Sequence, residues 1–182
     1  MEEFPKKIIL MGYMASGKSS VGRELAILLN RNFIDLDVFI AENEDLSISQ
    51  IFEEKGEPYF RKKEMVYLRE LLHNDSAFVL SVGGGTPTFT GAIEMINEKA
   101  FSIYLKASIQ TLFERLVPEK IERPLLKKIP DIALQEYIAV HLFERSHYYL
   151  KANLSVSVDF KSTNEISKEI VHLLKENGKL IH

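Results

Sequence analysis

The sequence predicts an α/β fold, in which a five-stranded parallel sheet is flanked by helices on both faces. Two observations lead to this prediction. Short apolar segments alternate with helical patterns along the chain, and a glycine-rich loop follows the first apolar segment. Ligands bind at the carboxyl ends of the strands in such sheets. We therefore expect the functional residues to lie just beyond the strand ends.

Five short apolar segments are predicted to be strands, at residues 7–11, 32–36, 77–82, 101–105 and 153–158. Helical patterns are found at residues 18–30, 38–44, 47–55, 57–74, 90–97, 108–116, 131–150 and 163–177. Ser47 and Gln50 fit a capping box at a helix start, and residues 163–165 likewise begin the last helix. Gly178 follows the last periodic residues, as expected where a helix stops. No repeat or linker interrupts the pattern, so residues 1–182 are predicted to form one domain.

The composition narrows the class of protein. A net charge of −3 offers no basic excess for a nucleic-acid surface, and the absence of cysteine excludes disulfides and thiolate metal sites. Glu2 and Glu3 precede an apolar run that leads straight into the glycine-rich loop, which predicts neither a signal peptide nor a membrane span. We expect a cytoplasmic protein with no nucleic-acid or membrane partner.

Residues 12–19 read G-x-x-x-x-G-K-S and lie between the first strand and the first helix. In such a loop the glycines let successive N–H groups cradle phosphate oxygens, and the helix N-terminus adds partial positive charge. Lys18 can reach the outer phosphates and the Ser19 hydroxyl can ligate Mg²⁺. The loop predicts a nucleotide site; a tight turn without chemistry is the alternative.

Asp35 and Asp37 close the second predicted strand. Carboxylates one residue apart on a strand point to the same side of the sheet, so one could hold Mg²⁺ through water while the other meets a substrate hydroxyl. The alternative is that Asp37 only caps the helix at 38–44.

Three glycines at residues 83–85 leave the third predicted strand, where they would let a ligand approach the backbone closely; a flexible loop is the alternative. Three arginines, at positions 61, 123 and 145, are further candidates, with a surface ion pair as the alternative for each. Arg123 lies in a proline-rich basic segment, residues 117–130, that we expect to be a mobile lid closing over phosphates.

Taken in order, these motifs resemble the shikimate kinase family. The elements G-x-x-x-x-G-K-S, D-x-D, F-R-x-x-E, a glycine triplet, R-P-L-L and E-R-x-x-x-Y stand at residues 12–19, 35–37, 60–64, 83–85, 123–126 and 144–149. The resemblance covers the chain from the first strand to about Asp159. It implies a three-layer P-loop kinase fold with a lid, and transfer of the γ-phosphoryl group of ATP to the 3-hydroxyl of shikimate with Mg²⁺. We expect a monomer.

The resemblance also implies roles for individual residues. ATP would be bound by Gly12, Ala15, Ser16, Gly17, Lys18, Ser19, Ser20 and Arg123, and Mg²⁺ by Ser19 and Asp35. Asp37 would meet the accepting hydroxyl as base or orienting group, and it forms the catalytic set with Lys18 and Arg123. The remaining substrate contacts would come from Arg61 and Arg145, which would hold the carboxylate, and from the backbone of Gly83, Gly84 and Gly85. Ala15 stands where glycine is common, and it is tolerated if its φ stays below zero.

Two alternatives remain open. One is another small-molecule kinase of the same fold, acting on gluconate or a nucleoside monophosphate, although Arg61, Gly84 and Arg145 favour a small hydroxylated carboxylate. The other is a non-catalytic nucleotide-binding module. A guanine-reading switch would carry an N-K-x-D tetrapeptide after a late strand, and the sequence has none.

Overall fold

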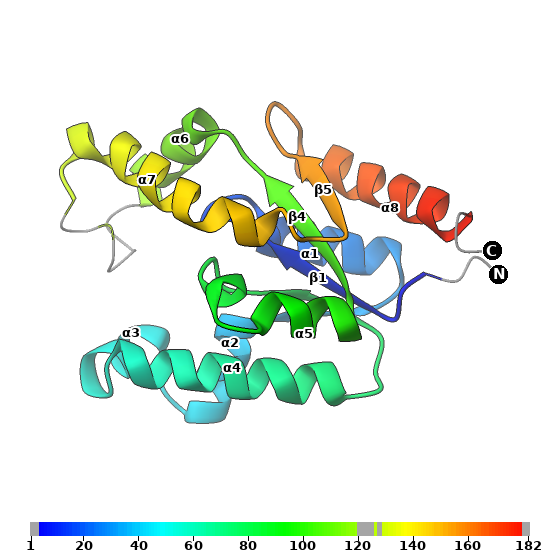
Figure 1. The fold of residues 1–182 in the computed structure, drawn as a ribbon, viewed down its shortest axis with the longest axis horizontal. Coiled ribbons are helices and arrows are strands. Elements are labelled where there is room, and N and C mark those ends of the chain that lie inside the picture. Colours follow the sequence, from blue (N-terminus) through cyan, green and yellow to red (C-terminus); the bar gives the residue numbers. More distant parts are fainter. Residues whose placement is uncertain (1–3, 120–125, 127–128, 180–182) are drawn as a thin grey trace.

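The computed structural model describes residues 4–119, 126 and 129–179. Its strands form one parallel sheet in the order β2-β3-β1-β4-β5 (Figure 1). They are β1 (Lys7–Met11), β2 (Asn32–Asp35), β3 (Phe78–Ser81), β4 (Phe101–Lys106) and β5 (Leu154–Ser157). All five predicted strands are present, each with its ends within two residues of the prediction, and the predicted fold class is confirmed.

The helices connect these strands and cover both faces of the sheet. They are α1 (Lys18–Leu28), α2 (Leu36–Glu44), α3 (Ile48–Glu54), α4 (Glu57–His73), α5 (Ala92–Lys99), α6 (Ile109–Glu119), α7 (Asp131–Tyr149) and α8 (Thr163–Lys179), with a 3₁₀ turn, η1 (Thr86–Thr88). No helix of the described residues is long and apolar enough to cross a membrane.

The central strand β1 shows why its sequence is apolar without interruption. Ile8 and Leu10 pack into one core cluster, with residues of α1, α6, α7 and α8. Ile9 and Met11 pack into a second cluster on the opposite face, with residues of α2, α3, α4 and α5. Alternate residues of a strand point to opposite faces, so a strand covered on both sides needs apolar side chains at every position.

Several helix ends differ from the prediction by two or three residues, and three of the differences have a clear physical reason. Helix α2 begins at Leu36, two residues early, because Asp35 caps it. Helix α6 continues past Pro118 to Glu119 and so includes the first residues of the predicted lid; a proline near a helix end loses only one backbone hydrogen bond. Helix α8 runs through Gly178 to Lys179, because a glycine costs a helix only about 1 kcal/mol and does not end it alone.

The sheet brings the ends of three neighbouring strands to one level. Ser81 at the end of β3 pairs with Asp35 of β2 on one side and with Leu10 of β1 on the other. The phosphate loop, the carboxylate pair and the glycine triplet begin directly after these positions. Three motifs that are far apart in sequence therefore start side by side.

Candidate active site

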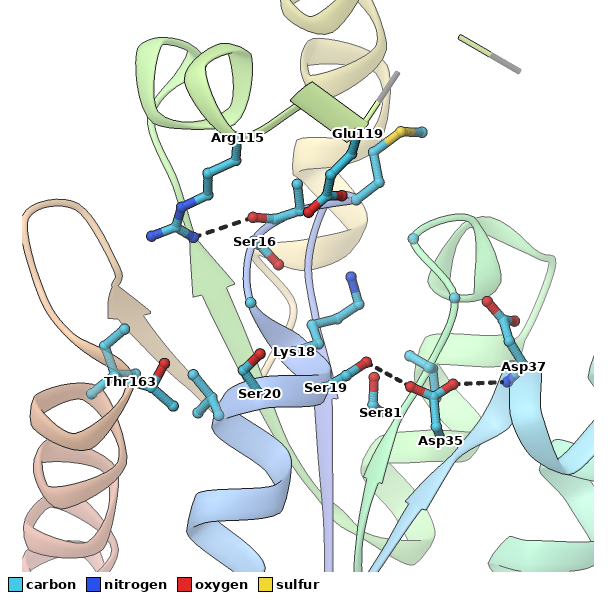
Figure 2. Close-up of a pocket in the computed structure, with 18 of the residues that line it drawn as sticks. Ser16, Lys18, Ser19, Ser20, Asp35, Asp37, Ser81, Arg115, Glu119 and Thr163 are labelled. Carbon is cyan, nitrogen blue, oxygen red and sulfur yellow. Dashed lines mark hydrogen bonds between the residues drawn. The ribbon is translucent and has the colours of Figure 1, made fainter. Parts of the chain in front are cut away.

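The phosphate loop, residues 12–19, joins β1 to α1 (Figure 2). Lys18 Nζ donates hydrogen bonds to the backbone oxygens of Gly12 at 3.0 Å and Tyr13 at 2.9 Å, which holds the loop closed around this side chain. Ser16 Oγ is fully buried and has no hydrogen-bond partner within the described residues. A buried hydroxyl without a partner is costly, and a phosphate oxygen entering the loop would satisfy it.

The backbone of this loop requires unusual conformations. Gly12 has a φ of 150°, and a Cβ there would lie 2.7 Å from the backbone oxygen of Leu105, so only glycine fits. Gly17 has a φ of 95° and Ala15 a φ of 60°. The condition under which alanine was expected to be tolerated, a φ below zero, is therefore not met. The loop needs a left-handed residue at this position, which costs an alanine roughly 1–2 kcal/mol, and the surrounding contacts hold it there.

The two aspartates lie together, though not for the predicted reason. Asp35 ends β2, whereas Asp37 stands in the first turn of α2, so strand alternation does not apply to them. Asp35 is the N-cap: Oδ1 accepts from the backbone N–H of Asp37 at 3.1 Å, and the alternative in which Asp37 caps the helix is wrong. Its other oxygen, Oδ2, accepts from Ser19 Oγ at 2.6 Å, as Figure 2 shows.

The Ser19–Asp35 pair fits Mg²⁺. A hydroxyl and a carboxylate oxygen are hard ligands, and Mg²⁺ at nucleotide sites takes one or two such protein ligands together with phosphate oxygens and water. Among the described residues, no group of three or more His, Cys, Asp or Glu side chains could hold a metal without such a nucleotide. The pair therefore matches a metal that arrives with phosphate rather than one bound by a complete protein cage.

Asp37 carries a perturbed carboxyl group. Burial and, after it, the nearby carboxylates of Glu64 and Asp35 raise its pKa to about 6, against the opposing charges of Lys18 and Arg61. Its Oδ1 is buried without a hydrogen-bond partner in the described structure. At pH 7 this oxygen is mainly ionised and is suited to accept a hydrogen bond or proton from a bound hydroxyl.

Each glycine of the triplet meets a different neighbour. A Cβ on Gly83 would lie 2.5 Å from Glu64 Oε1, and one on Gly85 would lie 3.3 Å from a guanidinium nitrogen of Arg61. A Cβ on Gly84 would lie 3.3 Å from the backbone nitrogen of Met14 and 3.4 Å from the backbone oxygen of Gly12. The triplet is therefore packed between α4 and the phosphate loop, and the flexible-loop alternative is wrong.

Arg61 on α4 is held by two carboxylates. Its guanidinium donates to Glu64 Oε2 at 2.9 Å and to Glu57 Oε1 at 3.1 Å. Glu64 is completely buried and also accepts a hydrogen bond from the Thr86 hydroxyl. Removal of Arg61 would leave the buried Glu64 carboxylate without its cationic partner, so this pairing fixes the orientation of Arg61.

Arg145 on α7 faces Arg61 across a small cavity. This cavity has a volume of about 390 Å³ and is lined by Glu57, Pro58, Arg61, Gly85, Thr88, Phe89 and Arg145. A larger cleft of about 710 Å³ contains the phosphate loop from Met14 onward, both aspartates, Gly83 and Gly84. The glycine triplet contributes to both spaces, so it marks the boundary between a phosphate cleft and a cavity with two guanidinium groups.

The predicted site residues thus converge on these two spaces, apart from two. Gly12 shapes the loop without lining the cleft, and Arg123 lies outside the described residues, as does most of the predicted lid. The cleft also contains residues that sequence reasoning gave no part in binding: Ser81, Arg115 and Glu119. Arg115 donates to the backbone oxygen of Ala15 at 3.2 Å. Arg115 stands two residues before the basic segment, and this position was its only signal in the sequence.

Comparisons with known proteins agree with this geometry. The sequence model for "Shikimate kinase" matches residues 14–175. The chain is 42% identical to the shikimate kinase of Flavobacterium psychrophilum over 170 residues, which are 93% of this chain and 99% of that protein. The fold matches shikimate kinase from Acinetobacter baumannii in complex with shikimate, with a TM-score of 0.87 and 32% identity over 97% of this chain and 96% of that one. Shikimate kinase from Bacteroides thetaiotaomicron matches with a TM-score of 0.85 and 32% identity over 93% and 98% of the two chains.

Proposed function

The chain belongs to the shikimate kinase family and is an ATP-dependent phosphotransferase that acts on shikimate, and we propose that its two spaces divide this reaction between them. The large cleft takes the phosphates of ATP, and the small cavity takes the carboxylate of shikimate. One observation carries the proposal: the two guanidinium groups line the small cavity, the phosphate loop and Asp37 line the large cleft, and the glycine triplet contributes to both spaces.

The small cavity suits a carboxylate because the guanidinium groups come from two different helices. Arg61 is oriented by Glu57 and Glu64, and Arg145 approaches from α7. Two planar forks aimed at one space can bind both oxygens of a carboxylate. Gly85 leaves room beside Arg61, and the open backbone of Gly83 and Gly84 faces the cleft, where the accepting end of the substrate would lie.

The reaction then follows from the positions of the chain's own groups. Asp37 Oδ1 accepts the proton of the 3-hydroxyl as that oxygen forms its bond to the γ-phosphorus, and the bond from the γ-phosphorus to the β,γ-bridging oxygen breaks to release ADP. The loop N–H groups and Lys18 stabilise the charge that spreads over the phosphoryl oxygens. Mg²⁺, held by Ser19 and Asp35, would add positive charge to the phosphates when bound.

The proposal also covers the lid, which lies mostly outside the described residues, the adenine site, and the state of the protein in the cell. We propose that Arg123 reaches the phosphates from a lid at residues 117–130, where closure would keep water from the phosphoryl group. The adenine would lie near residues 161–164, two of which, Lys161 and Thr163, line the cleft. A single domain, a monomeric state and a cytoplasmic location complete the proposal.

The acceptor is tested by coupling ADP release to NADH oxidation with shikimate, gluconate and nucleoside monophosphates as separate acceptors. We expect ADP release with shikimate and with neither of the other two acceptors. Turnover with gluconate or a nucleotide, and none with shikimate, would overturn the assignment.

The carboxylate site is tested by Arg61→Ala and Arg145→Ala. A lost hydrogen bond to a charged group costs roughly 1.5–3 kcal/mol, so the KM for shikimate should rise about 10- to 100-fold while the KM for ATP changes little. Arg69→Ala is the matched control because Arg69 is an exposed arginine on the same helix as Arg61. An unchanged KM for shikimate in both variants would exclude these arginines from the site.

A further inference from the structure

Tyr149, the last residue of α7, connects two parts of the proposed substrate site. Its side chain is completely buried, and its hydroxyl donates a hydrogen bond to the backbone oxygen of Gly84 at 2.5 Å. Gly84 is the middle residue of the glycine triplet and touches the phosphate loop. The end of α7 is therefore attached to the loop that divides the two spaces.

The same hydroxyl lies against Arg145, one helical turn earlier. Burial raises the pKa of Tyr149, whereas the nearby charge of Arg145 lowers it. The hydroxyl therefore keeps its proton at neutral pH. Since it donates that proton to Gly84, its lone pairs are left for the guanidinium.

Arg145 and Arg61 are held by opposite means. Arg61 is fixed by the carboxylates of Glu57 and Glu64. Arg145 lies beside aromatic residues instead: its charge acts on the Tyr149 hydroxyl, and its guanidinium carbon lies 5.7 Å from the centroid of the Tyr13 ring. A carboxylate would compete with the substrate for the guanidinium charge, whereas a phenol orients the group and leaves its charge available.

We propose that Tyr149 is a positioning residue, whose hydroxyl sets the place of the Arg145 guanidinium relative to Gly84 and thereby the affinity for the substrate carboxylate. This inference rests on the proposed function, because it takes Arg145 and Gly84 as substrate contacts. Tyr149 itself lines neither space and acts through these two residues.

The ring of Tyr149 is held independently of its hydroxyl. It stacks on Tyr104 of β4, with ring centroids 5.1 Å apart and planes 28° apart, and it belongs to the core cluster beneath α2–α5. Tyr149→Phe therefore removes the hydroxyl and its hydrogen bond to Gly84 and keeps the packing. Tyr104→Phe is the matched control, since it removes a hydroxyl from the stacked partner in the same cluster.

The experiment compares Tyr149→Phe, Tyr104→Phe and Arg145→Ala by steady-state kinetics, by titration calorimetry with shikimate in the absence of nucleotide, and by thermal unfolding. For Tyr149→Phe we expect the KM and Kd for shikimate to rise about 10-fold, from the loss of a polar group beside a charged one, with the KM for ATP within about twofold of the parent enzyme. Tyr104→Phe should leave all three constants within about twofold. In the Arg145→Ala background, Tyr149→Phe should add little to the Kd for shikimate, because the two residues act as a unit.

The possible failures are distinguishable. If Arg145→Ala leaves the affinity for shikimate unchanged, the proposed carboxylate site is wrong, and this inference falls with it. If Arg145→Ala weakens binding but Tyr149→Phe does not, the proposed function stands and the positioning role is overturned. Equal rises in both KM values, with a lowered unfolding temperature, would show that Tyr149 is only structural.

Discussion

Replacement of Asp37 by asparagine should make the protein more stable and nearly inactive. Burial, together with two neighbouring carboxylates, raises the pKa of Asp37 from 3.8 to about 6. Each pH unit corresponds to about 1.36 kcal/mol, so the ionised form costs the fold about 3 kcal/mol. Asparagine removes the charge and keeps the shape, but its amide is still a buried polar group. We therefore expect a net gain of about 2 kcal/mol, or roughly 4–8 °C in Tm.

The gain in unfolding free energy depends on pH because folding changes the proton affinity of Asp37. Between pH 4 and 6 the folded protein binds more protons at Asp37 than the unfolded chain does, so the parent protein loses stability as pH rises through this range. Above pH 6 the carboxyl is ionised in both states and the cost is complete. Well below pH 4 the carboxyl is neutral in both the folded and the unfolded state, and the cost in unfolding free energy is absent. The stability gap between variant and parent should thus be largest above pH 6 and should close towards pH 4.

Urea unfolding at pH 8 and at pH 4.5, without nucleotide or metal, measures this gap, and the coupled ADP assay measures turnover. Loss of an acid–base group lowers rates about 10²- to 10⁴-fold, so kcat should fall at least a hundredfold while ATP still binds. The matched control is Asp45→Asn, at the exposed end of the same helix, where the φ of 51° suits asparagine. A gap that is absent at pH 8, or that persists unchanged at pH 4.5, would refute the electrostatic reasoning; full activity would remove Asp37 from the mechanism.

Two further predictions concern the same fold. The kcat/KM for shikimate should fall about tenfold per pH unit below pH 6, because protonated Asp37 cannot accept the hydroxyl proton. Initial rates measured between pH 5 and 8 test this, and a kcat/KM that does not change with pH would contradict it. Gly22→Ala should lower the free energy of unfolding by about 1–3 kcal/mol, because its Cβ would lie 2.3 Å from Cε2 of Phe33. Urea unfolding measures that loss, and an unchanged midpoint would mean that Phe33 moves aside freely.

The strands and most of the site were predictable because they depend on local sequence. A strand buried on both faces needs a continuous apolar run, and residues 7–11 supply one. The chemistry of the phosphate loop likewise depends on residue types at fixed spacing. The order of these motifs along the chain then predicted that they meet at the strand ends.

The features that escaped prediction depend on contacts between distant residues or on backbone geometry. The left-handed Ala15 cannot be read from its side chain, because the loop imposes that conformation. Asp35 is the strand residue that was predicted, but its second role as the N-cap of α2 depends on the backbone geometry after it. Glu64 and Tyr149 belonged to recognised motifs, but their partners, Thr86 and Gly84, lie 22 and 65 residues away, and only the folded chain brings these groups together.

The pairing of Ser81 with both Asp35 and Leu10 also limits how the length of this chain can vary. One residue of strand advances about 3.3 Å, whereas a displacement of 1 Å can cost a reaction about a hundredfold. A single insertion or deletion within β1, β2 or β3 would therefore shift the ATP site relative to the shikimate site. It would also turn core side chains toward the wrong face of the sheet. We expect relatives to differ in length in connections such as residues 45–47 and 74–77, and to keep the residue count of these three strands. The register of the paired strands thus sets the distance between the two substrates, and it can change only in steps of one residue.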